Sequence, residues 1–249
     1  MFKINLDLIY EHIIFFPLIL TLLCYWVLRY FPKILHKPKN LGSLRAKVSK
    51  ISHRGSRFEG IVENTIASFK DAINAGTDVI EFDVWLSKDK KVVVFHDSNF
   101  SRMTKNKNNL SPYSTNYTDY PALSDSIQDQ NDRLGLLPNK EWSKIPLFQD
   151  VLDIIPNHVC FIIEFKQDSD ELISEVHRIL NSKGKTGNTF WFSLKESINK
   201  KLRSADKKIP TICSEIGMLK VLISHYIGIL PFISIDDAVF GVTTEEVDF

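Results

Sequence analysis

Residues 52–97 read SHRGSRFEGIVENTIASFKDAINAGTDVIEFDVWLSKDKKVVVFHD, and this stretch decides the fold. Residues 80–84 alternate apolar and acidic side chains, which predicts a β-strand with Glu81 and Asp83 on one face. Strand geometry places these two residues about 7 Å apart. Two such acids repel each other unless a cation lies between them, and oxygen ligands suit Mg²⁺ or Ca²⁺ better than Zn²⁺. The pair therefore predicts a divalent metal site.

Two histidines follow apolar runs in the same stretch. Residues 48–52 lead into His53, with Arg54 and Gly55 behind it, and residues 92–95 lead into His96. Residues 63–75 show helical periodicity and end at a glycine, so the strand at 48–52, this helix and the strand at 80–84 form a βαβ unit and predict a parallel sheet. Strand ends that bring histidines, an arginine and carboxylates to one face indicate an active site.

The motifs resemble one family in particular. HRG at residues 53–55, ENT at 63–65, E-x-D at 81–83, VVxFHD at 92–97 and E-x-K at 164–166 together resemble the glycerophosphodiester phosphodiesterase family. Five motifs in the right order form a specific signal. The resemblance covers roughly residues 48–235. It is closest to the membrane-anchored animal subgroup, the lysophospholipase D type, because of the apolar N-terminal segment and the YIGILPFISI stretch at residues 226–235.

The resemblance implies an α/β fold of the TIM (β/α)8-barrel type for residues 48–249, with residues 98–145 as an insertion that caps the barrel mouth. The length of the chain suits one such domain. About six strands can be counted where a complete barrel needs eight, so we expect the last strands to be missing and the domain to be truncated at its C-terminus. Further strands are predicted at residues 160–165, 189–192 and 209–213, and helices at 148–155, 170–181 and 196–205.

The resemblance and the residue chemistry together assign the site. Glu164 lies on a third apolar strand and joins Glu81 and Asp83 as a metal ligand, while His53 and His96 serve as acid and base, with the assignment between them open. Arg54 is the expected phosphate ligand. Lys166 shares the face of Glu164 and either screens that carboxylate or binds phosphate. Glu63 and Asn64 are expected to cap the helix that follows them rather than to bind metal.

The implied activity is metal-dependent hydrolysis of glycerophosphodiesters, with lysophospholipids as the expected substrates and release of the headgroup alcohol. The expected partners are this substrate and a membrane. The alternative is a non-catalytic, truncated form that acts as a binding or regulatory partner, or that is unstable. The first reading rests on the motifs and the second on the early terminus.

The N-terminal segment predicts a membrane anchor. Residues 13–28 are apolar apart from Thr21, so residues 8–31 reach the roughly 20 residues that a spanning helix needs, although Glu11 and His12 interrupt the segment near one end. No small-residue cleavage site follows, which disfavours a signal peptide. Residues 32–47 form a basic linker, and the single-pass protein is expected in the endoplasmic reticulum or another membrane with its catalytic part in the cytosol. Residues 216–235 are apolar in stretches and favour a segment that lies on a surface.

Bulk composition excludes some other classes. A formal net charge of +1 gives no overall field that would recruit nucleic acid. The three cysteines, Cys24, Cys160 and Cys213, lie far apart and match neither a metal-binding nor a disulfide spacing. The oligomeric state does not follow from the sequence.

Overall fold

The computed structural model describes residues 6–35, 48, 50–56, 61–105, 109–124, 126–128, 134–136 and 143–241 of the chain. The chain divides into two compact units. The larger unit comprises residues 40–218 and 237–249, and the smaller comprises residues 1–39 and 219–236. Every candidate site residue lies in the larger unit.

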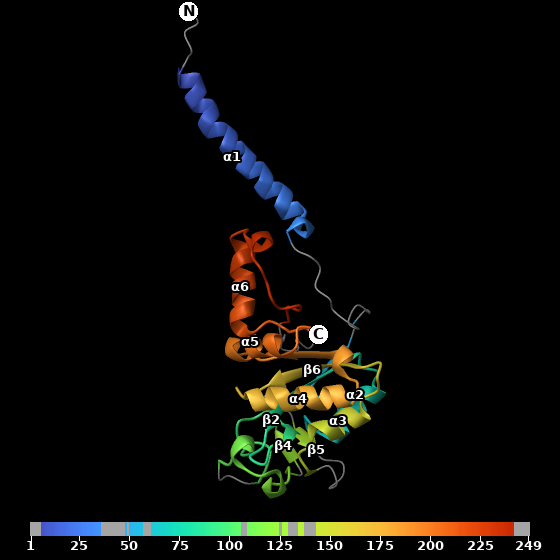
Figure 1. Ribbon diagram of the computed structural model, residues 1–249. Helices are drawn as coiled ribbons and strands as arrows, with labels where there is room; N and C mark the ends of the chain where they lie inside the picture. The colour runs from blue at the N-terminus through green and yellow to red at the C-terminus, as the bar shows by residue number, and fades with distance from the viewer. Residues whose placement is uncertain are drawn as a thin grey trace, which may run out of the picture. The chain divides into compact units, whose positions relative to one another are not determined.

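The larger unit is built on a parallel sheet, as the sequence predicts (Figure 1). Four strands follow one another in the order β1, β2, β6 and β7, each parallel to the next. Their bounds are Ile51–His53, Val79–Leu86, Cys160–Phe165 and Thr189–Phe192. The predicted strand at residues 209–213 is reduced to isolated parallel bridges from Thr211 to Trp191 and from Ile212 to Val239. Within the described ranges the strands show no closure into a barrel.

Strand β3 adds an antiparallel strand to this sheet. It covers Val92–Val94 and pairs with the C-terminal end of β2. The reason is the connection, because residues 87–91 are too few for a parallel crossover and form a hairpin turn instead. The hairpin brings the chain back to the site, where the Phe95 amide donates to the Asp83 carbonyl at 3.0 Å.

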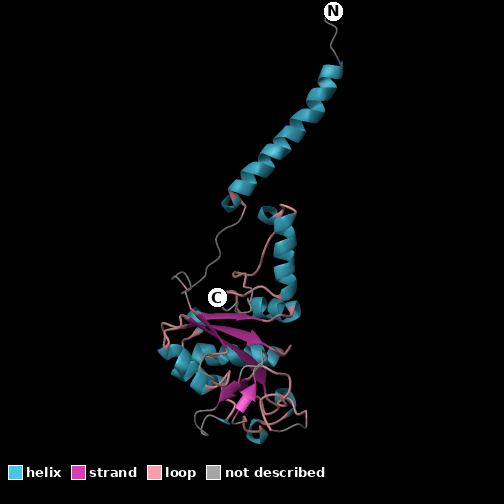
Figure 2. Ribbon diagram, turned by 180° about the vertical axis from the view of Figure 1, so that it is seen from behind, coloured by secondary structure: helices cyan, strands magenta, loops and turns pink. Residues whose placement is uncertain are grey.

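One face of the sheet carries the main core. Ile80, Phe82 and Val84 of β2 are fully buried and pack with apolar residues of β6 and β7. Helices cover this face, and they lie beside the strands in Figure 2. These helices are α2, Ile66–Asn74; α3, Phe148–Ile154; α4, Asp170–Ser182; and α5, Glu196–Ala205. The predicted alternation along β2 is confirmed, since Glu81 and Asp83 point to the opposite face.

The insertion at residues 98–145 is partly described and packs in a second core that it shares with neighbouring segments. It contains the short 3-10 helices Pro112–Ser114 and Tyr117–Asp119 and an antiparallel pair of strands, β4 at Ser126–Gln128 and β5 at Leu134–Leu136. A second buried apolar cluster joins this region to the β2–β3 hairpin. Its members are Val62, Trp85, Val93, Phe95, Phe100, Met103, Leu123 and Ile145.

The smaller unit combines the two apolar segments of the sequence. Helix α1 covers Leu6–Tyr30, and the Tyr25 ring stacks on Phe232 at 5.5 Å while its hydroxyl donates to the Gly228 carbonyl at 3.0 Å. Helix α6, Glu215–Tyr226, runs from the larger unit into this one and exposes several apolar side chains. A 3-10 turn at Leu230–Phe232 follows it.

The predicted transmembrane anchor at residues 8–31 is not supported. In the part of the chain that the structure describes, no helix has both the length and the apolar character needed to cross a membrane. The anchor prediction therefore needs correction, although the segment does form a helix. Residues 36–47 of the predicted basic linker lie outside the described residues.

Gly55 lies in the turn after β1, where the backbone packs closely against Ser68 of helix α2. Gly55 has φ +84°, and a Cβ there would lie 2.4 Å from Ser68 Oγ and 2.9 Å from the Ser68 backbone carbon. Gly76 has a similar φ of +74°, but a Cβ there meets nothing within 4 Å. We expect Gly76→Ala to cost about 1–2 kcal/mol for backbone strain alone. Gly55→Ala should cost about 2–4 kcal/mol, because steric overlap adds to the strain.

Denaturant unfolding of both variants measures the difference. Equal losses in the free energy of unfolding from the two substitutions would show that Ser68 and helix α2 move aside freely, and would contradict the close packing of the turn.

Candidate active site

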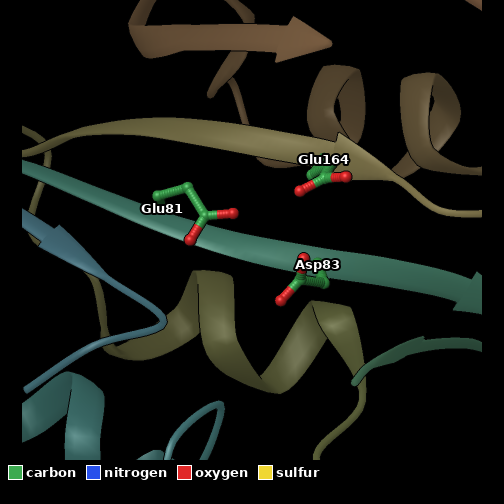
Figure 3. A group of neighbouring side chains, drawn as sticks. All are labelled: Glu81, Asp83 and Glu164. Atoms are coloured by element: carbon green, nitrogen blue, oxygen red, sulfur yellow. The ribbon is translucent and has the colours of Figure 1, made fainter. Parts of the chain in front are cut away.

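Three carboxylates from two neighbouring strands form the centre of the site (Figure 3). Glu81 and Asp83 come from β2 and Glu164 from β6, and the strand register pairs Asp83 directly with Glu164. The three are buried, and each offers an oxygen within 4.8 Å of the others'. The structure thus brings together the three residues that the sequence proposed as metal ligands.

The electrostatics of this cluster favour a cation. Burial, followed by repulsion from Asp83 and Glu164, raises the pKa of Glu81 well above 4.5. Burial and the charge of Asp83 likewise raise the pKa of Glu164. Glu81 Oε1 is buried and has no hydrogen-bond partner among the described residues. Oxygen donors that repel one another in this way suit a hard divalent cation such as Mg²⁺ or Ca²⁺.

Lys166 screens the cluster from within. Its Nζ lies 3.0 Å from Asp83 Oδ1 and 2.6 Å from Glu164 Oε1. Burial would lower the pKa of Lys166, but Asp83 and Glu164 together raise it. For Asp83, burial acts to raise the pKa, yet Lys166, His96 and Arg54 lower it overall. Of the two roles open to Lys166, the geometry shows charge screening, while phosphate binding stays a prediction.

His53 and Arg54 reach the cluster from β1. The parallel register sets His53 beside Glu81, and His53 Nε2 lies 3.7 Å from Glu81 Oε2. Arg54 has a left-handed backbone with φ 59°, and its amide donates to Glu81 Oε2 at 3.0 Å. Its side chain is 5% exposed, with Nε 3.5 Å from Asp83 Oδ2. The turn after β1 therefore presents both groups to the carboxylates.

His96 follows the β3 hairpin, which pairs with the same edge of β2 as β1 does. It lies near enough to Asp83 and Glu164 to lower the pKa of Asp83. Its Nδ1 is 2.7 Å from Asp97 Oδ1. Burial would raise the pKa of Asp97, but hydrogen bonds from His96 and Arg102 hold that pKa at about 2. The carboxylate of Asp97 is thus ionised at neutral pH.

Glu63 and Asn64 do not cap helix α2, contrary to the sequence-based expectation. Thr65 is the N-cap, and its side chain and that of Ser68 form a reciprocal capping box. Glu63 Oε1 instead accepts from Arg54 at 3.1 Å and from Arg102 at 2.6 Å. Asn64, at φ 54°, donates from Nδ2 to Asp83 Oδ2 at 2.8 Å.

Sequence reasoning therefore missed four residues that surround the carboxylates: Glu63, Asn64, Asp97 and Arg102. The ENT tripeptide could have indicated two of them, since asparagine tolerates the left-handed backbone that turns Asn64 toward Asp83. For Arg102 no local pattern distinguishes it from a surface arginine.

The comparisons with known proteins agree with this geometry. Residues 53–217 match the model of the glycerophosphoryl diester phosphodiesterase family. The chain belongs to this family. Human "Lysophospholipase D GDPD1" is 30% identical over 212 residues, which cover 85% of this chain and 65% of that protein. Human "Lysophospholipase D GDPD3" is 27% identical over 209 residues, which cover 84% of this chain and 63% of that protein. The chain thus spans less than two thirds of the length of these relatives.

Solved structures of the family share the fold. The glycerophosphoryl diester phosphodiesterase domain of a Mycobacterium tuberculosis protein gives a TM-score of 0.61 at 18% identity, covering 74% of this chain and 66% of that chain. A phosphodiesterase from Oleispira antarctica, in complex with the product sn-glycerol-3-phosphate, gives a TM-score of 0.53 at 23% identity, covering 66% of this chain and 65% of that chain. At these identities the likeness shows the fold alone.

The raised pKa of Glu81 predicts a trade-off between stability and metal binding. Ionising Glu81 costs the metal-free folded state free energy, so its stability should fall as the pH rises above 4.5 and through the raised pKa. Glu81→Gln removes that charge, so it should flatten the pH dependence and stabilise the metal-free protein near neutral pH by about 1–3 kcal/mol. Unfolding in chelator at about pH 5 and about pH 8 measures both effects.

Glu171→Gln, at a half-exposed residue paired with Lys90 on the surface, is the matched control and should change little. A loss of stability in the Glu81 variant at high pH would mean that the ionised carboxylate is already compensated without metal.

Proposed function

We propose that the protein is a metal-dependent phosphoric diester hydrolase that cleaves glycerophosphodiesters. The observation that carries this proposal is the buried cluster of Glu81, Asp83 and Glu164 with His53 and His96 close to it. Membership of the family and the names of the relatives support the same reaction. So does the Oleispira antarctica structure, which holds sn-glycerol-3-phosphate as a product.

The three carboxylates would hold the divalent ion, Mg²⁺ or Ca²⁺. When bound, that ion supplies positive charge that polarises the phosphoryl group and offsets the negative charge of the diester. Arg54 contributes further positive charge from the turn after β1, and Lys166 from the end of β6. Positive charge already in place at the site stabilises negative charge as it develops at phosphorus.

His53 and His96 are proposed as the groups that transfer protons. One takes a proton from the attacking water, and the other gives a proton to the departing headgroup oxygen. A P–O bond to water forms, the P–O bond to the headgroup breaks, and the phosphate stays on the glycerol. Histidine suits both tasks, because its usual pKa of about 6.5 lies near neutral pH. Which histidine takes which role is open.

The sheet is proposed to belong to a (β/α)8-type barrel. Support comes from the parallel order of β1, β2, β6 and β7, from the helices between them, and from the shared fold of the family structures. In such a barrel, catalytic side chains lie at the C-terminal ends of the strands. Glu164 and Lys166 lie at the C-terminal end of β6 and His53 at that of β1, which agrees with that rule.

The proposed activity predicts a specific loss on changing Asp83. Purified protein with Mg²⁺ or Ca²⁺ should release choline from glycerophosphocholine or lysophosphatidylcholine, and chelation should abolish the release. Asp83→Asn keeps the volume of the side chain but removes a ligand charge, and should lower kcat/KM by about 10²-fold or more. Choline release is the measurement.

Asp153→Asn, at a surface residue paired with Lys183, is the control and should keep full activity. Undiminished turnover in the presence of chelator would remove the metal from the mechanism, while metal binding without any turnover would leave a metal-binding protein rather than a hydrolase.

The preferred substrate is proposed to be a lysophospholipid, because both human relatives carry the name lysophospholipase D. An acyl chain that buries four to six methylenes would contribute about 3–5 kcal/mol, which corresponds to a preference of about 10²–10⁴-fold. We therefore expect kcat/KM to be higher for lysophosphatidylcholine than for glycerophosphocholine, measured in mixed micelles. Equal values on the two substrates would assign the protein to water-soluble diesters.

A further inference from the structure

A chain of charged hydrogen bonds runs beside the carboxylate cluster and includes residues to which the proposed reaction gives no role. Arg102 Nε lies 2.7 Å from Asp97 Oδ2, and Arg102 NH2 lies 3.0 Å from Asp97 Oδ1. The same NH2 group is 2.6 Å from Glu63 Oε1. Glu63 Oε1 also accepts from Arg54 at 3.1 Å. One guanidinium therefore connects the partner of His96 to the partner of Arg54.

The contact between Asp97 and His96 has a defined direction. With its pKa at about 2, Asp97 is a carboxylate at neutral pH and can only accept hydrogen bonds. The 2.7 Å contact therefore requires the proton on His96 Nδ1. In the neutral ring this leaves Nε2 as the basic nitrogen.

Arg102 in turn fixes Asp97. It donates to both carboxylate oxygens, so the plane of the carboxylate is held and Oδ1 is aimed at His96. Its own side chain is 24% exposed, whereas that of Glu63 is 2% exposed. The far end of the guanidinium is thus anchored on a buried acid, and if it moved into solvent it would leave that acid with Arg54 as its remaining partner among the ion pairs of the described residues.

We propose that Arg102 is a positioning residue. Through Asp97 it holds His96 in the tautomer with its proton on Nδ1, and through Glu63 it fixes the position of the Arg54 side chain relative to His96. The expected effect on kcat rests on the proposed function, whereas the expected effect on the tautomer of His96 does not. Arg102 touches neither substrate nor metal in this scheme.

The structural consequence is tested by ¹⁵N NMR of the histidine rings in metal-free protein at about pH 8, where an ordinary imidazole is neutral. His96→Gln identifies the His96 signals by their loss. In the wild type we expect a protonated Nδ1 and an unprotonated Nε2. Arg102→Met should give a mixture of the two tautomers. Arg178→Met, which removes a surface arginine paired with Glu175 on α4, should leave the ring signals unchanged.

Asp97→Asn sharpens the test. Arg102 Nε needs an acceptor, so the asparagine oxygen turns to Arg102 and its amide faces His96 Nδ1. That nitrogen must then accept, and the proton moves to Nε2. We expect the two ring signals of His96 to exchange their character in this variant. A wild-type protein with Nε2 protonated, or an Arg102→Met variant with an unchanged tautomer and a native melting curve, would overturn the proposal.

The kinetic consequence is measured as choline release. Arg102→Met should lower kcat by about 10–100-fold with KM nearly unchanged, as is usual for groups that orient a reacting residue. Arg102→Lys keeps the charge but cannot bridge Asp97 and Glu63 together, and should recover only part of the rate. A fall in kcat/KM through KM alone would overturn the positioning role. Inactivity of the wild type would refute the proposed function while the NMR result still decides this inference.

Discussion

The constraint on which the rest of the larger unit depends is the burial of like charges at one end of a parallel sheet. Five carboxylates, Glu63, Glu81, Asp83, Asp97 and Glu164, lie among only three basic side chains, Arg54, Arg102 and Lys166. With neutral histidines this leaves a formal charge of −2, which one divalent cation would balance. Buried charges that lack such balance cost several kcal/mol each, so the site is built at the expense of stability and for a ligand.

The sheet itself explains why these acids meet. Alternation along β2 sends Ile80, Phe82 and Val84 into the main core and leaves Glu81 and Asp83 on the other face. The register with β6 then sets Glu164 opposite Asp83, and the register with β1 sets His53 opposite Glu81. Because the apolar face is fully packed against helices, a slip of one residue would place the acids in the core, and the register is fixed for that reason.

The sequence alone supports the parallel sheet, the faces of β2 and the carboxylate set, because a period of two and a run of motifs are visible without a structure. The sequence does not predict features that lack a recognisable local pattern. The β2–β3 turn has Lys90 at φ 65°, a position that glycine or asparagine usually occupies, so the hairpin carries no turn signature. The ENT tripeptide holds three possible N-caps in a row, and only the structure shows that Thr65 takes that role. Long-range ion pairs such as that of Glu63 with Arg102 leave no local pattern at all.

Two separate cores hold the two halves of the site. The main core under β2 and β6 fixes the carboxylates that are proposed to bind metal. The second cluster, which contains Phe100 and Met103 of the insertion, fixes the segment that carries Arg102. Phe100 and Met103 are almost wholly buried, and the Thr104 amide bonds to the Phe100 carbonyl at 3.0 Å, so the backbone at Arg102 has little freedom. The insertion therefore acts on the proposed proton-transfer side of the site through its packing, and loosening that cluster should disturb His96 before it disturbs the metal ligands.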